Sequence, residues 1–182
     1  MIRSALAVLF AAAIALWAVS SLAAGGRAAA ATLTGEVVAV QDGDTITVLD
    51  AQRTQHRVRL AGIDSPETGQ PYGHRARQAL AQAVFRRQVV VSWSKRDRYG
   101  RIVGKVLQDG RDVCLAQVSE GFAWHYEQYS RDQPPADRDS YRQAQAAARS
   151  ASRGLWQDPA PVAPWDYRRA RAESRADAAH SR

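Results

Sequence analysis

The sequence has a single cysteine, Cys114, among its 182 residues. One thiol cannot form an internal disulfide, so the folded chain must be stabilised by its hydrophobic core. Cys114 stands in the apolar stretch DVCLAQV, which predicts that it packs as a small hydrophobic residue. The sequence also has only four histidines, which show no HExxH or His-His spacing. No structural zinc pattern emerges from these residues.

Acidic residues are fewer than basic ones. There are 25 Lys and Arg residues against 18 Asp and Glu, which gives a formal net charge of +7. This surplus favours an anionic partner such as nucleic acid. Many solvated surfaces are basic, however, so charge alone leaves three classes open. These are an enzyme that acts on nucleic acid, a module that only binds it, and a basic protein that adheres to envelope polyanions.

Long apolar runs are confined to the N-terminus. The uncharged run Ala5–Val19 follows Arg3 and precedes small residues that suit cleavage, which is typical of an export signal. We therefore predict that residues 1–31 are a signal peptide and that the product is secreted or periplasmic. The alternative is an uncleaved membrane anchor formed by residues 5–24. Two serines interrupt its apolar run, and a glycine pair follows it directly. Only in that alternative would the membrane be a partner.

The rest of the chain has the composition of one globular domain with appendages. TLTGEVVAVQDGDTITVLD predicts a hairpin around Asp42-Gly43, and QHRVRLAGI predicts a third strand. Side chains alternate along a strand, so Arg59 points away from the face that Val58 and Leu60 share. Arg59 is thus fixed on a rigid element, beside a buried apolar pair.

Further elements follow in order. Helical periodicity predicts a helix over Tyr72–Arg86 and a final helix that runs from Tyr141 and stops at Gly154. QVVVSW and RIVGKVLQ predict two more strands, and a short helix is expected over Val113–Ser119. We predict an α+β fold, a small five-stranded barrel with about three packed helices. The domain is expected over residues 32–157, and residues 158–182 are expected to be a Pro-rich connector and a flexible charged tail.

Two aspartates could meet at one end of the predicted strands. Asp44 leaves the hairpin turn and Asp64 follows the third strand, and neighbouring antiparallel strands can bring them together as oxygen ligands for a hard cation. Glu67 lies three residues beyond Asp64. Taken singly, these residues also suit ordinary turns or a short helix start.

Two arginines complete a chemically meaningful set. Arg59 and Arg101 carry planar guanidinium groups, which suit phosphate because they are bidentate and always charged. A cation held by Asp44 and Asp64 would neutralise a phosphodiester oxygen, while the arginines would stabilise the charge that grows on the phosphoryl group. Glu67 would orient or deprotonate the attacking water. The set predicts phosphodiester hydrolysis.

The motifs DGDTITV, RVRLAGIDSPE, YG, DRYGR, EGFAW and GLW stand in the order found in the staphylococcal nuclease family. From about Thr32 to Trp156 the sequence resembles that family. The resemblance implies an oligonucleotide-binding-type barrel with three helices and a calcium cofactor. It also implies DNA and RNA as substrates, cleaved to leave 3′-phosphate and 5′-hydroxyl ends. No stable protein partner is implied. The rival prediction is a barrel that binds single-stranded nucleic acid without cutting it.

The resemblance also assigns roles to matching positions. It implies that Asp44, Asp64 and the backbone carbonyl of Ser65 bind calcium, and that Arg59, Glu67 and Arg101 are catalytic. Arg98 and Tyr99 match positions that contact the terminal phosphate and base region of a nucleotide. Tyr126 and Tyr129 cannot be aligned residue by residue with the family's tyrosine cluster. For them we hypothesise stacking on single-stranded bases.

Overall fold

The computed structural model describes residues 31–180. The predicted export signal lies outside the described residues, except for its last position, Ala31. Within residues 31–180, no helix is both long and apolar enough to cross a membrane.

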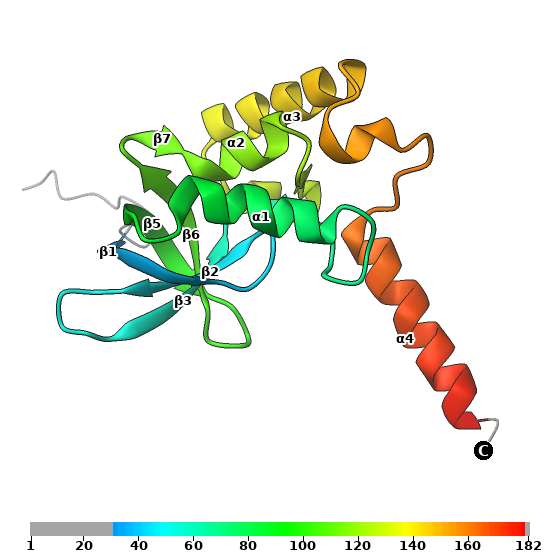
Figure 1. Ribbon diagram of the computed structural model, residues 1–182, viewed down its shortest axis with the longest axis horizontal. Coiled ribbons are helices and arrows are strands. Elements are labelled where there is room, and N and C mark those ends of the chain that lie inside the picture. The colour runs from blue at the N-terminus through cyan, green and yellow to red at the C-terminus, as the bar shows by residue number, and fades with distance from the viewer. Residues whose placement is uncertain (1–30, 181–182) are drawn as a thin grey trace, which may run out of the picture.

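Five strands form a closed barrel (Figure 1). The strands β1 (Ala31–Val40), β2 (Thr45–Leu49) and β3 (Gln55–Leu60) form an antiparallel meander, and β5 (Gln88–Arg96) and β6 (Ile102–Gln108) extend the sheet from the other edge of β1. The barrel closes because β3 pairs in parallel with β6. Arg59 lies opposite Thr45 on one side and Val103 on the other. The predicted α+β barrel is therefore confirmed, and Arg59 sits at its closure.

Alternating apolar residues fill the barrel, as the period-two pattern predicts. Val58 and Leu60 of β3 are buried, whereas Arg57 is exposed and Arg59 half-buried. Helices α1 (Gly73–Val84) and α2 (Val113–Ser119) cover this core. Cys114 of α2 is fully buried in it, which confirms its packing role.

Helix α1 is shorter at both ends than the predicted Tyr72–Arg86, and the helix predicted to start at Tyr141 begins earlier. Helix α3 spans Pro135–Ser150, so it ends before Gly154. The backbone turns at Ser152, where φ is 49°, and Gly154 opens the short 3-10 helix η2 (Gly154–Gln157). A Cβ on Gly154 would lie 2.2 Å from the carbonyl oxygen of Gly121. Glycine is therefore needed for close backbone packing rather than as the helix terminator.

Short elements surround the open side of the barrel. Strand β4 (Ile63–Asp64) pairs with β8 (Trp124–His125), which is followed by the 3-10 helix η1 (Glu127–Asp132). The two-residue strand β7 (Arg111–Asp112) extends the sheet beside β6. The β4–β8 pair holds the segment after β3 against the segment that leads into η1.

The C-terminal segment differs from the expected connector and tail. Pro164–His180 form helix α4, which projects from the body of the protein (Figure 1). Ala163 and Pro164 are buried, and the Trp165 ring stacks on Tyr126 with centroids 5.2 Å apart. The sequence prediction was based on the proline and charge content of this segment. It overlooked that one proline can begin a helix and that one tryptophan can anchor it.

Candidate active site

The predicted site residues gather around one cavity of about 830 Å³. It opens where β3, β4, the β5–β6 loop, η1 and α4 meet. All the residues proposed above for metal binding, catalysis and substrate binding line this cavity: Asp44, Arg59, Asp64, Ser65, Glu67, Arg98, Tyr99, Arg101, Tyr126 and Tyr129. The tertiary structure thus brings the whole set together, and the role of each residue remains a prediction.

Arg59 bridges the two aspartates at the centre of the site. Its Nη1 lies 2.9 Å from Asp44 Oδ2, and its Nη2 lies 2.9 Å from Asp64 Oδ1. Burial disfavours the charged guanidinium, but the charges of Asp44 and Asp64 outweigh it, so the pKa of Arg59 lies above its ordinary value. One guanidinium can span both carboxylates only because they face each other across it.

The backbone fixes the two aspartates where the strands end. The backbone amide of Leu60 donates to the Asp44 carbonyl at 2.8 Å, which ties the hairpin turn to the end of β3. The backbone amide of Ser65 donates to Asp44 Oδ2 at 2.7 Å. Hydrogen bonds from the backbone amides at the end of β3 and in the segment after it therefore hold Asp44 close to Asp64, and both side chains are buried.

The negative charge at this end of the barrel is concentrated. Asp42 accepts the Asp44 backbone amide at 3.0 Å, which is the turn role that its position predicts. Burial, together with the charge of Asp44, raises the pKa of Asp42 to about 6. Burial also raises the pKa of Asp64, although hydrogen bonding from Arg168 and the charge of Arg59 act in the opposite direction. A buried carboxylate stays ionised only when a positive charge lies close to it, because burial removes the water that would stabilise its charge.

Arg168 of α4 supplies part of that charge, and the sequence prediction missed it. Its Nη2 lies 2.8 Å from Asp64 Oδ2, and its Nη1 lies 2.7 Å from Glu67 Oε1. The Glu67 side chain is 39% exposed, so it stands at the mouth of the cavity. A signal existed in the sequence, because Pro164 precedes arginines at helical spacing. Nothing in the sequence indicated that this helix would return to the carboxylates.

Arg101 approaches the aspartates from the β5–β6 loop. Its Nε donates to Asp97 Oδ2 at 2.7 Å, and its Nη1 lies 3.4 Å from Thr45 Oγ1. Thr45 Oγ1 in turn donates to Asp44 Oδ1 at 3.2 Å. Arg101 is therefore linked to the aspartates through a threonine, and it lies to the side of the Arg59 bridge.

Aromatic and basic side chains form the rim. The Tyr99 ring is exposed, and the Arg98 guanidinium lies 4.8 Å from its centroid. Tyr129 of η1 is also exposed and contacts Tyr126 edge-on, with ring centroids 4.9 Å apart. One face of Tyr126 is already covered by Trp165, whose ring plane is inclined by 6°. This rim offers ring faces and cations, the groups that hold single-stranded nucleic acid.

The donor set fits a hard cation that takes few ligands from the protein. Within residues 31–180 no cluster of three or more His, Cys, Asp or Glu side chains is placed to hold a metal ion. Asp44 and Asp64 offer carboxylate oxygens, which Ca²⁺ and Mg²⁺ prefer, and a backbone carbonyl, water and substrate oxygens would complete the coordination. Arg59 and Arg168 now balance the charge of these carboxylates.

Comparisons with known proteins identify the family of this chain. A family model described as "Staphylococcal nuclease homologue" matches residues 57–158. The micrococcal nuclease of Shigella flexneri is 42% identical over 177 residues, which cover 92% of this chain and 96% of that protein. Protein ParB of Escherichia coli is 46% identical over 148 residues, with coverage of 76% and 81%. An uncharacterized endonuclease of Escherichia coli is 42% identical over 139 residues, with coverage of 76% and 86%.

Proposed function

The chain belongs to the family of staphylococcal nuclease homologues, and from this premise we propose that it is a calcium-dependent endonuclease of low sequence specificity. That it is a nuclease follows from the family and from relatives that are named as nucleases. The ion, activity on RNA as well as DNA, and 3′-phosphate and 5′-hydroxyl ends are the proposed part. Arg98 and Tyr99 would hold a phosphate and a base, which carry little sequence information.

One observation supports this function above the others: Arg59 holds Asp44 and Asp64 together, and Glu67 stands at the mouth of the same cavity. A protein that only binds nucleic acid needs phosphate-binding cations and stacking rings. It has no need of two buried aspartates and a third carboxylate beside the phosphate position, since these repel a polyanion. The acidic groups therefore support a catalytic site.

Each residue has a definite task in the proposed reaction. Asp44, Asp64 and the Ser65 carbonyl would hold Ca²⁺, which when bound supplies charge neutralisation at a phosphodiester oxygen. Arg59 and Arg101 would donate N–H groups to the phosphoryl oxygens as their negative charge grows. Glu67 would accept a proton from the attacking water, and its partial exposure leaves room for that water. The water oxygen would bond to phosphorus as the bond from phosphorus to the 5′ oxygen breaks; the phosphate would stay on the 3′ side, and the 5′ oxygen would take a proton from solvent to leave as a hydroxyl.

The substitution Glu67→Gln tests this proposal. It removes the proton acceptor and keeps the size of the side chain, so turnover should fall by about 10² to 10⁴-fold with folding retained. Plasmid cleavage should be measured with calcium, magnesium or chelator, on DNA and RNA, with the product ends identified. If the parent protein retards the plasmid on a gel in the presence of calcium but leaves it uncut, the proposal of a nuclease is refuted. An active Glu67→Gln variant would refute the role of Glu67.

Export is a separate part of the proposal. It is supported by the charged start, apolar run and small residues of positions 1–31. The N-terminal residue of the mature product should lie near Thr32, and the protein should appear in the periplasm or the medium. Full-length protein retained in membranes would instead support the anchor formed by residues 5–24.

A further inference from the structure

Three arginines of α4 share one face of the helix. Arg168, Arg171 and Arg175 are spaced three and four residues apart, so at 3.6 residues per turn they lie within an arc of about 60°. The acidic residues of α4 (Asp166, Glu173 and Asp177) lie on about the opposite side. This segregation gives the helix one basic edge, although its net charge is small. We call these three arginines the arginine row.

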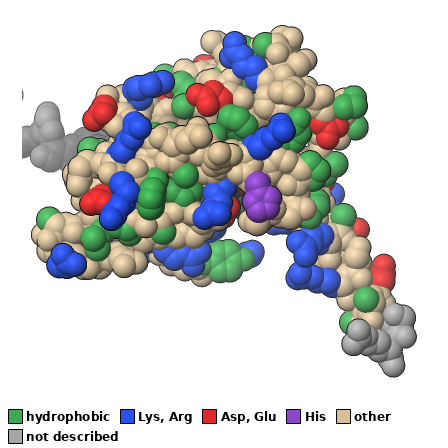
Figure 2. Space-filling model, viewed as in Figure 1, with side chains coloured by type: hydrophobic (Ala, Val, Ile, Leu, Met, Phe, Trp, Pro, Cys, Tyr) green, Lys and Arg blue, Asp and Glu red, His purple; other side chains and the backbone are tan. Residues whose placement is uncertain are grey.

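The arginine row is continuous with the active site. A second cavity, of about 170 Å³, is lined by all three arginines, Tyr167, Ala172 and Glu67. Glu67 and Arg168 line both this cavity and the larger one. Figure 2 shows basic side chains clustered where α4 leaves the body of the protein. A concave path therefore leads from the carboxylates along the basic edge of α4.

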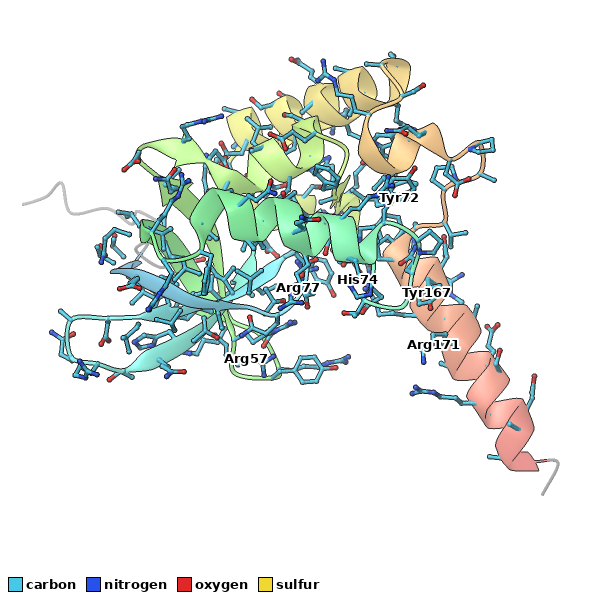
Figure 3. All side chains as sticks on the ribbon, in the orientation of Figure 1. Arg57, Tyr72, His74, Arg77, Tyr167 and Arg171 are labelled. Carbon is cyan, nitrogen blue, oxygen red and sulfur yellow. The ribbon has the colours of Figure 1, made fainter. Side chains whose placement is uncertain are left out.

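The start of α4 is held firmly against the site. The Tyr167 hydroxyl donates to the Gly69 carbonyl at 2.8 Å, and Gln70 Nε2 donates to the Val162 carbonyl at 2.6 Å. Together with the Trp165–Tyr126 stack, these contacts fix the direction of the arginine row relative to Glu67. Arg171 lies over the Tyr167 ring at 5.8 Å, and Figure 3 shows both on the side of α4 that faces the barrel.

The later turns of α4 are exposed to solvent. From Arg168 to Ala179 every residue is exposed. Residues 168–179 include no large apolar side chain, so hydrophobic burial does not account for the position of the arginines. A basic edge that begins at the catalytic carboxylates suits a polyanion.

We propose that the arginine row is a nucleic-acid-binding subsite that holds backbone phosphates of the substrate beyond the bond that is cut. The proposal rests on the proposed nuclease function and deepens it. The row extends about 10 Å along the helix axis, at 1.5 Å per residue. That length corresponds to about three phosphates at 3.4 Å of axial rise per strand. The substrate that suits the row is a polynucleotide that continues past the active site. When it binds, Arg168 leaves Glu67 and contacts the first of these phosphates.

The salt dependence of binding tests the subsite directly. The double variant Arg171→Ala/Arg175→Ala removes two members of the row and keeps helix propensity high. Binding of a labelled DNA duplex should be measured by fluorescence anisotropy over a series of salt concentrations, with chelator present to prevent cleavage. The slope of log K against log salt should become shallower by about 0.9 for each arginine, or about 1.8 for the pair.

A matched control separates position from net charge. The double variant Arg142→Ala/Arg169→Ala also removes two arginines, and these are paired with Asp139 and Asp166 away from both cavities. Its slope should stay close to that of the parent protein. Equal slope changes in both double variants, or no change in either, would overturn the subsite. Plasmid cleavage by the parent protein in calcium is scored separately, so failure of the nuclease function would be recognised independently.

Discussion

Removal of Arg59 should destabilise the protein, because two buried carboxylates would lose the guanidinium between them. The Asp44 and Asp64 side chains are 7% and 2% exposed, and each lies 2.9 Å from Arg59. Breaking a buried ion pair from one side costs about 3 to 5 kcal/mol. We expect Arg59→Ala to lose about 3 kcal/mol, the lower end of this range, because Arg168 still contacts Asp64.

Urea denaturation followed by tryptophan fluorescence measures this loss. With a slope of about 2 kcal/mol per molar urea, the midpoint should fall by about 1.5 M. Arg57→Ala is the matched control, since Arg57 lies on the same strand but is exposed, and it should change stability by less than about 0.5 kcal/mol. Calcium should restore part of the stability of Arg59→Ala, because a cation between the aspartates replaces the lost charge.

Two results would refute this reasoning. A loss of stability below about 1 kcal/mol for Arg59→Ala is what an exposed ion pair would give. It would mean that water or a proton stabilises the two carboxylates once the arginine is gone. Strict additivity of Arg59→Ala and Asp64→Asn would mean that the two side chains are not energetically coupled. In the expected case the double variant is more stable than the sum of the single losses predicts, because the neutral amide at position 64 no longer needs the arginine.

Two further predictions concern Cys114 and the anchor of α4. Burial, reinforced by the charge of Asp112, raises the pKa of the Cys114 thiol to about 12; the native protein at pH 8 should therefore not react with Ellman's reagent, whereas the urea-unfolded chain should, and rapid native reaction would contradict its burial. Trp165→Ala removes the stack on Tyr126 and should loosen α4, so trypsin should cut at the α4 arginines several-fold faster while the barrel stays resistant. Unchanged cleavage of α4 would show that Trp165 is not its anchor.

The location of α4 places the positive charge of Arg168 beside the carboxylates of Asp64 and Glu67. It contacts Asp64 and Glu67 at once, and it belongs to a helix whose first turn is fixed and whose later turns are exposed. Arg168 can exchange these carboxylates for substrate phosphates, because its side chain is 43% exposed and is not packed in the hydrophobic core. The arginine row therefore connects phosphate binding outside the cavity with the charge balance inside it.

The amino-acid sequence by itself determined the strands and helices of the barrel and the local placement of several candidate site residues. Alternation in RVRL fixed which side of β3 carries Arg59, and the Asp42-Gly43 turn fixed where Asp44 leaves the hairpin. These features are local, because strand periodicity and turn chemistry depend on neighbouring residues. For the same reason, the sequence predicts the helix over Val113–Ser119 with the bounds that the structure shows.

Only the tertiary structure decided how distant segments meet. The parallel β3–β6 pairing closes the barrel, and the return of α4 places Arg168 on Asp64 across 104 positions of sequence. Such contacts depend on packing and on electrostatic partners that no local pattern encodes. A proline-rich, arginine-rich segment has the same composition whether it extends into solvent or docks through one tryptophan. The segment docks because Ala163 and Pro164 are buried against the protein and Trp165 stacks on Tyr126.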